Sequence, residues 1–102
     1  MADLPATLVD DIDEAVDLPG AFEILRDAEG RPTDMLYICP CGCGHTGTLR
    51  LRPCDERPSW DMRGPIDRPT LTPSVHHILQ RTTGGERTHW HGWLTAGVWR
   101  PC

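Results

Sequence analysis

Cys39-Pro40-Cys41-Gly42-Cys43-Gly44-His45 places three thiols and one imidazole within one short run, which we call the cysteine turn (residues 39–45). Thiolate and imidazole are the ligands that zinc prefers, and structural zinc sites combine ligands from a tight turn with ligands from a distant segment. Gly42 and Gly44 permit the positive φ angles that such a turn needs. The stretch therefore predicts a metal-binding turn between two strands.

We expect Zn2+ to be held by Cys39, Cys41, Cys43 and, from the far end of the chain, His89, with Cys102 in reserve. The cysteines are spaced two apart instead of the usual three, so the spacing does not fix which of them bind. Three thiolates and an imidazole close the site, and such zinc is structural. With only three protein ligands, the fourth position could hold an activated hydroxide.

The length of 102 residues suits one domain with a thin core, which often needs a metal or disulfides as reinforcement. The chain has neither a secretory leader nor an apolar run near the ~20 residues of a membrane span, so we expect a cytoplasmic protein with no membrane partner. In that reducing compartment, the five cysteines are expected to be ligands or free thiols.

Charge separates the first part of the chain from the rest. Residues 1–20 contain six acidic residues and no basic one, and we expect them to form a leader that is disordered or a short helix near Leu8 to Val16. The second unit is the domain over residues 21–102. Its arginines do not form a concentrated basic run, so we expect no nucleic-acid binding.

Short β-like runs separated by turn residues begin at Ala21. Residues 46–52 alternate polar and apolar side chains, and the prolines of residues 68–74 exclude a helix. The expected strands are 22–26, 35–39, 46–52, 60–64, 75–80, 88–94 and 98–100. The predicted fold class is mostly β, a small zinc-stabilised antiparallel β domain with an acidic N-terminal leader.

Two segments together supply a serine and several histidines: Pro73-Ser74-Val75-His76-His77 and Thr88-His89-Trp90-His91-Gly92-Trp93. A serine becomes nucleophilic only when a base within hydrogen-bond reach accepts its proton, and His91 can supply that base to Ser74. On a regular strand His89 and His91 point to the same face, so one could bind metal while the other reaches the serine. A serine in a turn and a packed histidine explain the same residues without catalysis.

Four motifs occur in series over residues 35–100: Cys39 to His45, Trp60 to Gly64, Thr70 to Val75, and His89 through Trp99. This series resembles a family of small phage and bacterial zinc-binding proteins of unknown function, often mislabelled in phage genomes as ammonia monooxygenase. Some relatives are encoded beside bacterial ubiquitin-like conjugation genes, where they resemble the processing or deconjugating peptidase. The resemblance implies Ser74 as nucleophile and His91 as its base. Relatives usually carry a cysteine near the place of His89.

We therefore expect a zinc-containing serine-type peptidase that processes or deconjugates a bacterial ubiquitin-like protein, with that protein or its conjugates as partner. Asp61, Asp67 and His76 are the candidates for a third, orienting residue. One alternative is a non-enzymatic zinc-ribbon-like protein-binding module, in which the four tryptophans form a core or an aromatic face. The other is a metallohydrolase that uses zinc-bound water.

Overall fold

A computed structural model describes residues 3–81 and 85–102, and for residues 77–81 and 85–89 it describes the backbone alone. The fold is mostly β, as expected, with two four-stranded sheets and a two-stranded ribbon in the described residues. The first sheet has the order β1 (Leu4–Pro5), β10 (Val98–Pro101), β9 (Gly85–Thr95), β8 (Val75–Arg81). The second has the order β2 (Thr7–Leu8), β3 (Ala21–Arg26), β4 (Pro32–Ile38), β5 (Thr46–Arg50), and the ribbon pairs β6 (Asp61–Arg63) with β7 (Thr70–Thr72).

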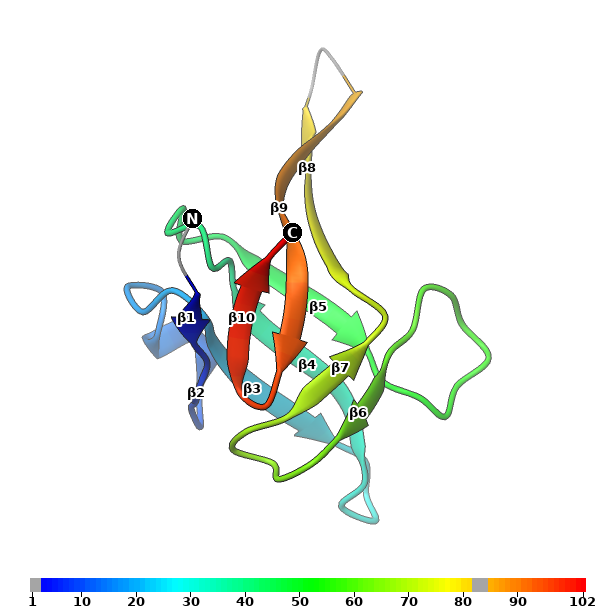
Figure 1. The fold of residues 1–102 in the computed structure, drawn as a ribbon. Coiled ribbons are helices and arrows are strands. Elements are labelled where there is room, and N and C mark those ends of the chain that lie inside the picture. The colour runs from blue at the N-terminus through cyan, green and yellow to red at the C-terminus, as the bar shows by residue number, and fades with distance from the viewer. Residues whose placement is uncertain (1–2, 82–84) are drawn as a thin grey trace.

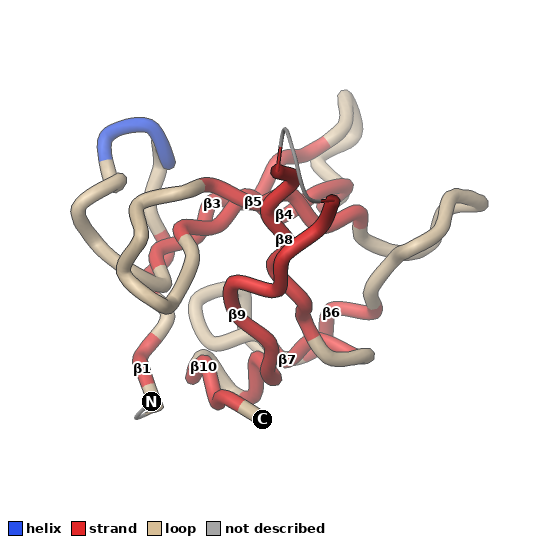
Figure 2. The backbone as a smooth tube through the Cα atoms, turned by 90° about the horizontal axis from the view of Figure 1, so that it is seen from above, coloured by secondary structure: helices blue, strands red, loops and turns tan. Residues whose placement is uncertain are grey.

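The two larger sheets form two layers around one core. Figure 1 shows β9 and β10 in front of β3, β4 and β5, and the view from above in Figure 2 places the same strands on opposite sides. Apolar side chains from both layers meet between them: Phe22, Met35, Tyr37, Leu49, Val75, Trp90, Leu94 and Trp99 are all buried. The alternation on β9, where Trp90 and Leu94 are buried and His91 and Trp93 are exposed, shows how the sequence pattern directs one face inward.

Residues 3–20 pack onto the domain. β1 pairs with β10 antiparallel, and β2 pairs with β3 in parallel. The named strands of residues 21–102 pair with one another antiparallel, as expected, and the leader adds the one parallel pair of named strands among the described residues. The only helical turn among the described residues is a 3-10 turn at Ile12–Glu14, capped by Asp11, whose side chain accepts from the Asp13 amide. Ile12 is buried beside Ala21 and Ile38, so an apolar side chain attaches this acidic segment to the second sheet.

Trp99 joins the start of the chain to its end. Its side chain is fully buried, and its Nε1 donates a hydrogen bond of 2.9 Å to the Gly20 carbonyl oxygen. Gly20 has a φ of +82°, and an added Cβ there would lie 2.9 Å from Cδ1 of Trp99. The close approach of backbone and indole therefore requires glycine at this position.

Three of the four tryptophans belong to the core. Trp60, Trp90 and Trp99 are buried, and the rings of Trp90 and Trp99 meet edge to face with centroids 5.6 Å apart. Trp93 is 44% exposed on the outer face of β9. The aromatic residues are thus mainly core, as one reading of the sequence expected, with one indole left on the surface.

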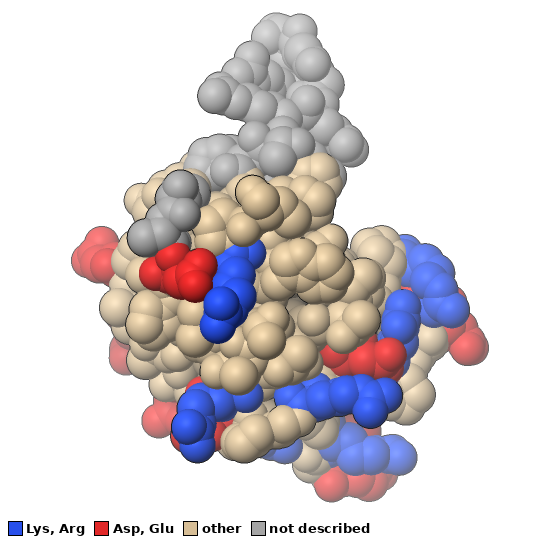
Figure 3. Space-filling model, viewed as in Figure 1, with Lys and Arg blue, Asp and Glu red and all other residues tan. Residues whose placement is uncertain are grey.

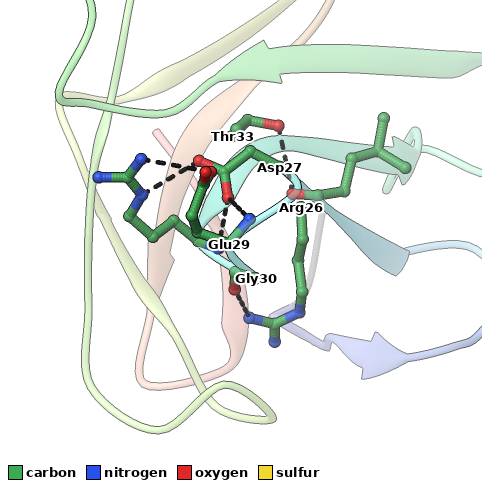
Figure 4. A network of polar contacts seen from close by, with 7 residues as sticks. Arg26, Asp27, Glu29, Gly30 and Thr33 are labelled. Atoms are coloured by element: carbon green, nitrogen blue, oxygen red, sulfur yellow. Dashed lines mark hydrogen bonds and ion pairs between the residues drawn. The ribbon is translucent and has the colours of Figure 1, made fainter.

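A polar network fixes the turn between β3 and β4 (Figure 4). Asp27 Oδ1 accepts hydrogen bonds from the backbone amides of Arg31 and Glu29, each 2.9 Å long, and Asp27 Oδ2 accepts one of 3.1 Å from Arg31 Nε. These contacts, led by the Arg31 amide, lower the pKa of Asp27 below its ordinary value. The turn between the expected strands 22–26 and 35–39 is therefore held by the Asp27 carboxylate.

Charges of both signs are mixed on the face drawn in Figure 3, where arginines lie beside aspartates and glutamates and form no continuous basic surface. Ion pairs such as Arg50 with Asp34, at 3.0 Å, and Arg52 with Asp61, at 3.1 Å, show the same mixing. In residues 3–81 and 85–102, no helix has the length and apolar character needed to cross a membrane.

Candidate active site

The structure brings Ser74 and His91 together. Ser74 lies in the bend between β7 and β8, and His91 lies on β9, which pairs with β8. The Ser74 Oγ is 3.1 Å from Nε2 of His91, within hydrogen-bond distance. Ser74 is half-buried and His91 is exposed, so a substrate can reach both groups. This is the distance that a serine and its general base require.

His76 lies directly opposite His91 in the pairing of β8 with β9. The two imidazole rings have centroids 4.7 Å apart and an interplanar angle of 33°. Side chains directly opposite on antiparallel strands are close enough to restrict each other's rotamers. The His76 ring therefore limits the orientations that His91 can adopt.

The backbone at both catalytic candidates is anchored. Trp60 Nε1 donates a hydrogen bond of 3.1 Å to the Ser74 carbonyl oxygen, and the Cys102 amide donates one of 3.0 Å to the His91 carbonyl oxygen. Trp60 lies 14 residues before Ser74. No local pattern in the sequence marks this contact, because the paired strands β6 and β7 lie between the two residues in the chain and bring them together.

The other two candidates for an orienting residue are placed differently. Asp61 is on β6, where its Oδ2 accepts a hydrogen bond of 3.1 Å from Arg52 Nη1. Asp67 is in the turn between β6 and β7, which is closed by a bond from the Arg68 amide to the Pro65 carbonyl oxygen. Of the three candidates, His76 is the one whose contact with His91 is directly seen.

The cysteine turn brings three thiols into one cluster. The Sγ atoms of Cys39, Cys41 and Cys43 all lie within 4.8 Å of one another, and those of Cys39 and Cys41 are 3.4 Å apart. Tetrahedral zinc with Zn–S bonds of ~2.3 Å separates its sulfur ligands by about 3.8 Å. The spacing of the three sulfurs thus fits a metal ion, and small rotations would bring all three to ligand distance.

Backbone geometry shapes this turn as the glycines predict. Gly42 and Gly44 have φ angles of +92° and +80°, and the Cys39 amide donates to the His45 carbonyl oxygen at 2.9 Å across the turn. The His45 amide approaches Sγ of Cys43 at 3.5 Å, a contact typical of a thiolate ligand that accepts from the backbone. The segment could hold a metal ion, and it also closes the β4–β5 hairpin.

Burial raises the pKa of the Cys39 thiol, and the neighbouring sulfurs of Cys41 and Cys43 add to this effect. Burial, followed by the sulfurs of Cys39 and Cys43, also raises the pKa of Tyr37. Apolar surroundings disfavour a lone thiolate, whereas a bound cation would remove that penalty and displace the thiol protons. The chemistry of this donor set therefore matches a metal better than free thiolates.

His89 is the predicted fourth ligand, from the far end of the chain. The side chain of His89 lies outside the described residues. In the backbone, Trp90 pairs with His77 and Thr88 pairs with Ile78, so the register shifts at His89. The expectation that His89 and His91 share a face concerns a side chain outside the described residues and stays a prediction.

Cys54 and Cys102 do not belong to the thiol cluster of the described residues. Cys102 is exposed next to His91, and Cys54 Sγ contacts the Glu56 carbonyl oxygen at 3.7 Å. None of the five cysteines forms a disulfide in the structure.

Comparison with known proteins adds the family. No curated protein and no solved structure matches the chain. The family model of the bacterial ubiquitination-like system serine proteases, BubE, matches residues 8–102, which include the cysteine turn, Ser74 and His91. This match confirms the resemblance to proteins of ubiquitin-like conjugation systems. The chain belongs to the BubE family of bacterial ubiquitination-like system serine proteases.

Proposed function

We propose that this protein is a serine peptidase with Ser74 as nucleophile and His91 as general base, and that it processes a ubiquitin-like protein or releases it from its target. The observation that carries the proposal is the distance of 3.1 Å between Ser74 Oγ and His91 Nε2 on an accessible surface. The family name supports a protease of a ubiquitination-like system, and hence a polypeptide substrate.

The two side chains account for both halves of a hydrolysis. As Ser74 Oγ bonds to the carbonyl carbon, its proton passes to His91 Nε2, and that proton then goes to the leaving amine as the C–N bond breaks. Water next gives a proton to His91 and attacks the resulting ester, and the proton returns to Ser74 Oγ as the ester bond breaks. We expect backbone amides beside Ser74 to stabilise the oxyanion.

His76 is the positioning residue in this proposal. Its ring packs against His91 at 4.7 Å and restricts the base to orientations that face Ser74. A packed neighbour of this kind lowers the entropy cost of reaching the reactive geometry.

Zinc is proposed as a structural ion. Cys39, Cys41 and Cys43 would hold it, with His89 as the fourth ligand, and the ion would then have no position for water. Bound there, it would link the β4–β5 hairpin to β9 and so support the strand that carries His91. All three cysteines also pack on the main core cluster, which makes the site part of the fold.

The test combines active-site labelling with metal analysis. Ser74→Ala should abolish labelling by diisopropyl fluorophosphate and lower the cleavage of a ubiquitin-like fusion by on the order of 10⁴-fold or more, while zinc content stays unchanged. The matched control is Ser59→Ala, since Ser59 is the only other serine of the chain and its side chain is buried. This variant should still be labelled.

Two other results would replace the proposal. Cleavage that survives Ser74→Ala but stops when a chelator removes the metal from folded protein would favour a metallohydrolase. Binding of a ubiquitin-like protein without labelling or cleavage would favour a non-enzymatic binding module.

A further inference from the structure

One edge of the second sheet is open beside the Ser74–His91 pair. β5 is the last strand of that sheet, and β4 pairs with it from Thr46 to Arg50. On its other side, Leu51 forms a single parallel bridge with Trp60, which closes the edge just after β5 ends. Within the described residues, no segment pairs with that edge over Thr46–Leu49.

The hydrogen bonds show which backbone groups face this edge. The Leu51 amide donates to Thr33 next to β4, whereas the Arg50 carbonyl oxygen accepts from the Trp60 amide on the opposite side. Because successive residues of a strand alternate, the amides and carbonyls of Thr46 and Thr48 also point away from β4. They form a short ladder of donors and acceptors at the open edge.

A groove of about 270 Å³ follows the same edge. Thr46 to Leu49 form one wall, while Trp60 and His76 belong to the other. His76 packs on His91, and Trp60 bonds to the Ser74 carbonyl, so this second wall leads directly to the candidate catalytic pair. Two residues that line the groove thus contact the candidate catalytic pair, and the groove carries backbone groups suited to an extended chain.

β8 presents its own edge to the groove. The His91 carbonyl oxygen accepts from Cys102 on the β10 side, so the pair His91 with His76 is not one of the hydrogen-bonded pairs between β9 and β8. The backbone groups of His76 therefore point away from β9. Strand edges of both sheets thus border the same groove.

We propose that the groove binds the substrate tail as an added β-strand on Thr46–Leu49, which delivers the scissile carbonyl to Ser74. This inference rests on the proposed function, because the occupant is the polypeptide that Ser74 would cleave. Strand addition at a free edge is a general mode of peptide binding, in which main-chain hydrogen bonds give the affinity. The groove volume of about 270 Å³ lies just below the roughly 300–1,000 Å³ of drug-sized pockets, so the probe that tests it carries a slender tail.

The test uses a proline on the outward-facing side of β5. Thr48→Pro removes the amide that would donate to the tail and none that pairs with β4, and proline is tolerated on an edge strand at such a position. Thr48→Val is the matched control, since it keeps the amide and loses only the hydroxyl. Two diphenyl phosphonate probes are compared, one bearing a tetraglycine tail and one bearing an acetyl group in its place.

The tailed probe should label Ser74 of the wild type at least about tenfold faster than the acetyl probe. Thr48→Pro should remove that advantage, so that the tailed and acetyl probes label it equally fast, and Thr48→Val should keep it. Tailed and acetyl probes that label Ser74 equally fast in the wild type, or a tail advantage that survives Thr48→Pro, would overturn the inference and leave the serine mechanism intact. Labelling by neither probe would instead refute the proposed function, and the docking inference with it.

A set of N-methylated probes tests strand addition on the wild type, even if the Thr48→Pro variant does not fold. N-methylation of successive amides in the tetraglycine tail should slow labelling of the wild type at alternate positions, because an added strand bonds through every second residue. Equal rates for all methylated probes would refute strand addition. A dimer in sedimentation that Thr48→Pro dissociates, with no change in labelling by the tailed probe, would show that a second copy of the chain covers this edge.

Discussion

At the scale of single residues, the candidate site depends on close contacts that allow little change. His91 lies between the buried Trp90 and Gly92, and it meets Ser74 on one side and the His76 ring on another. Rotation of the imidazole would break the 3.1 Å contact with the serine. The neighbours that hold this ring should therefore affect rate more than substrate binding.

His76→Ala should slow the labelling of Ser74 by diisopropyl fluorophosphate by on the order of tenfold, since His91 would lose the ring that restricts it. His76→Phe should restore most of the rate, because it keeps a ring at 4.7 Å without a titratable nitrogen. Labelling rates against pH for all three proteins give the measurement. An equal loss in His76→Phe would show that the nitrogen, and not the packing, is required.

Gly92→Ala should destabilise the fold by at least about 3 kcal/mol, the upper end of the usual cost of overpacking. The added Cβ would clash with the Arg100 carbonyl oxygen on β10 and would lie 2.6 Å from Cη2 of Trp90. Urea denaturation gives the measurement. Gly30→Ala is the control, because nothing lies within 4 Å of its Cβ, and its positive φ should cost only about 1–2 kcal/mol. Equal losses would mean that the sheet relaxes around residue 92.

At the scale of elements, turns determine which strands can pair. The β9–β10 hairpin turns at Ala96 and Gly97, both with positive φ, which matches the right-handed twist of the flanking strands. The sequence predicted this loop and the β5 strand, because glycine placement and alternation are local signals. It did not predict the register shift at His89, which arises from pairing with β8.

Asp27→Asn should make the stability of the fold less sensitive to low pH. Since the folded pKa of Asp27 is lowered, its contribution to stability is present above its unfolded pKa of ~3.9 and is lost as the pH falls through the lower folded value. The melting temperature of the wild type should thus fall more steeply than that of Asp27→Asn from about pH 5 downward. Glu29→Gln, which leaves the Asp27 contacts to the amides in place, is the control and should follow the wild type. Parallel curves for wild type and Asp27→Asn would contradict this account.

At the scale of the whole molecule, a chain of 102 residues has a thin core between its two layers. The thiols of the cysteine turn contribute to that core, and Cys39 is fully buried. Residues 4–8 add edge strands to both sheets, and Trp99 closes the structure onto Gly20 across 79 positions of sequence. Loss of the metal proposed at the cysteine turn should therefore lower the stability of the whole fold.

Cys43→Ser should lose zinc and lower the melting temperature. A loss of ~3 kcal/mol corresponds to a fall of roughly 12–24 °C for a domain near this size. Metal analysis by mass spectrometry and calorimetry give the two measurements. Cys54→Ser is the matched control, since Cys54 lies outside the thiol cluster. Zinc retained in Cys43→Ser, or lost equally in both variants, would contradict the assignment of ligands.

The sequence by itself determined what is local: the strands that alternate with period two, the glycines of the cysteine turn, and the residue types that zinc and acyl transfer require. Only the tertiary structure decided which of these residues meet. The Ser74–His91 contact spans 17 positions and the Trp60–Ser74 contact spans 14, and both depend on how separate strands pair and pack. The strands β1 and β2 of the acidic leader likewise depend on pairing with β10 and β3. Strand propensity is encoded in neighbouring residues, whereas the open edge of β5 and its groove exist only after two sheets have packed around a common core.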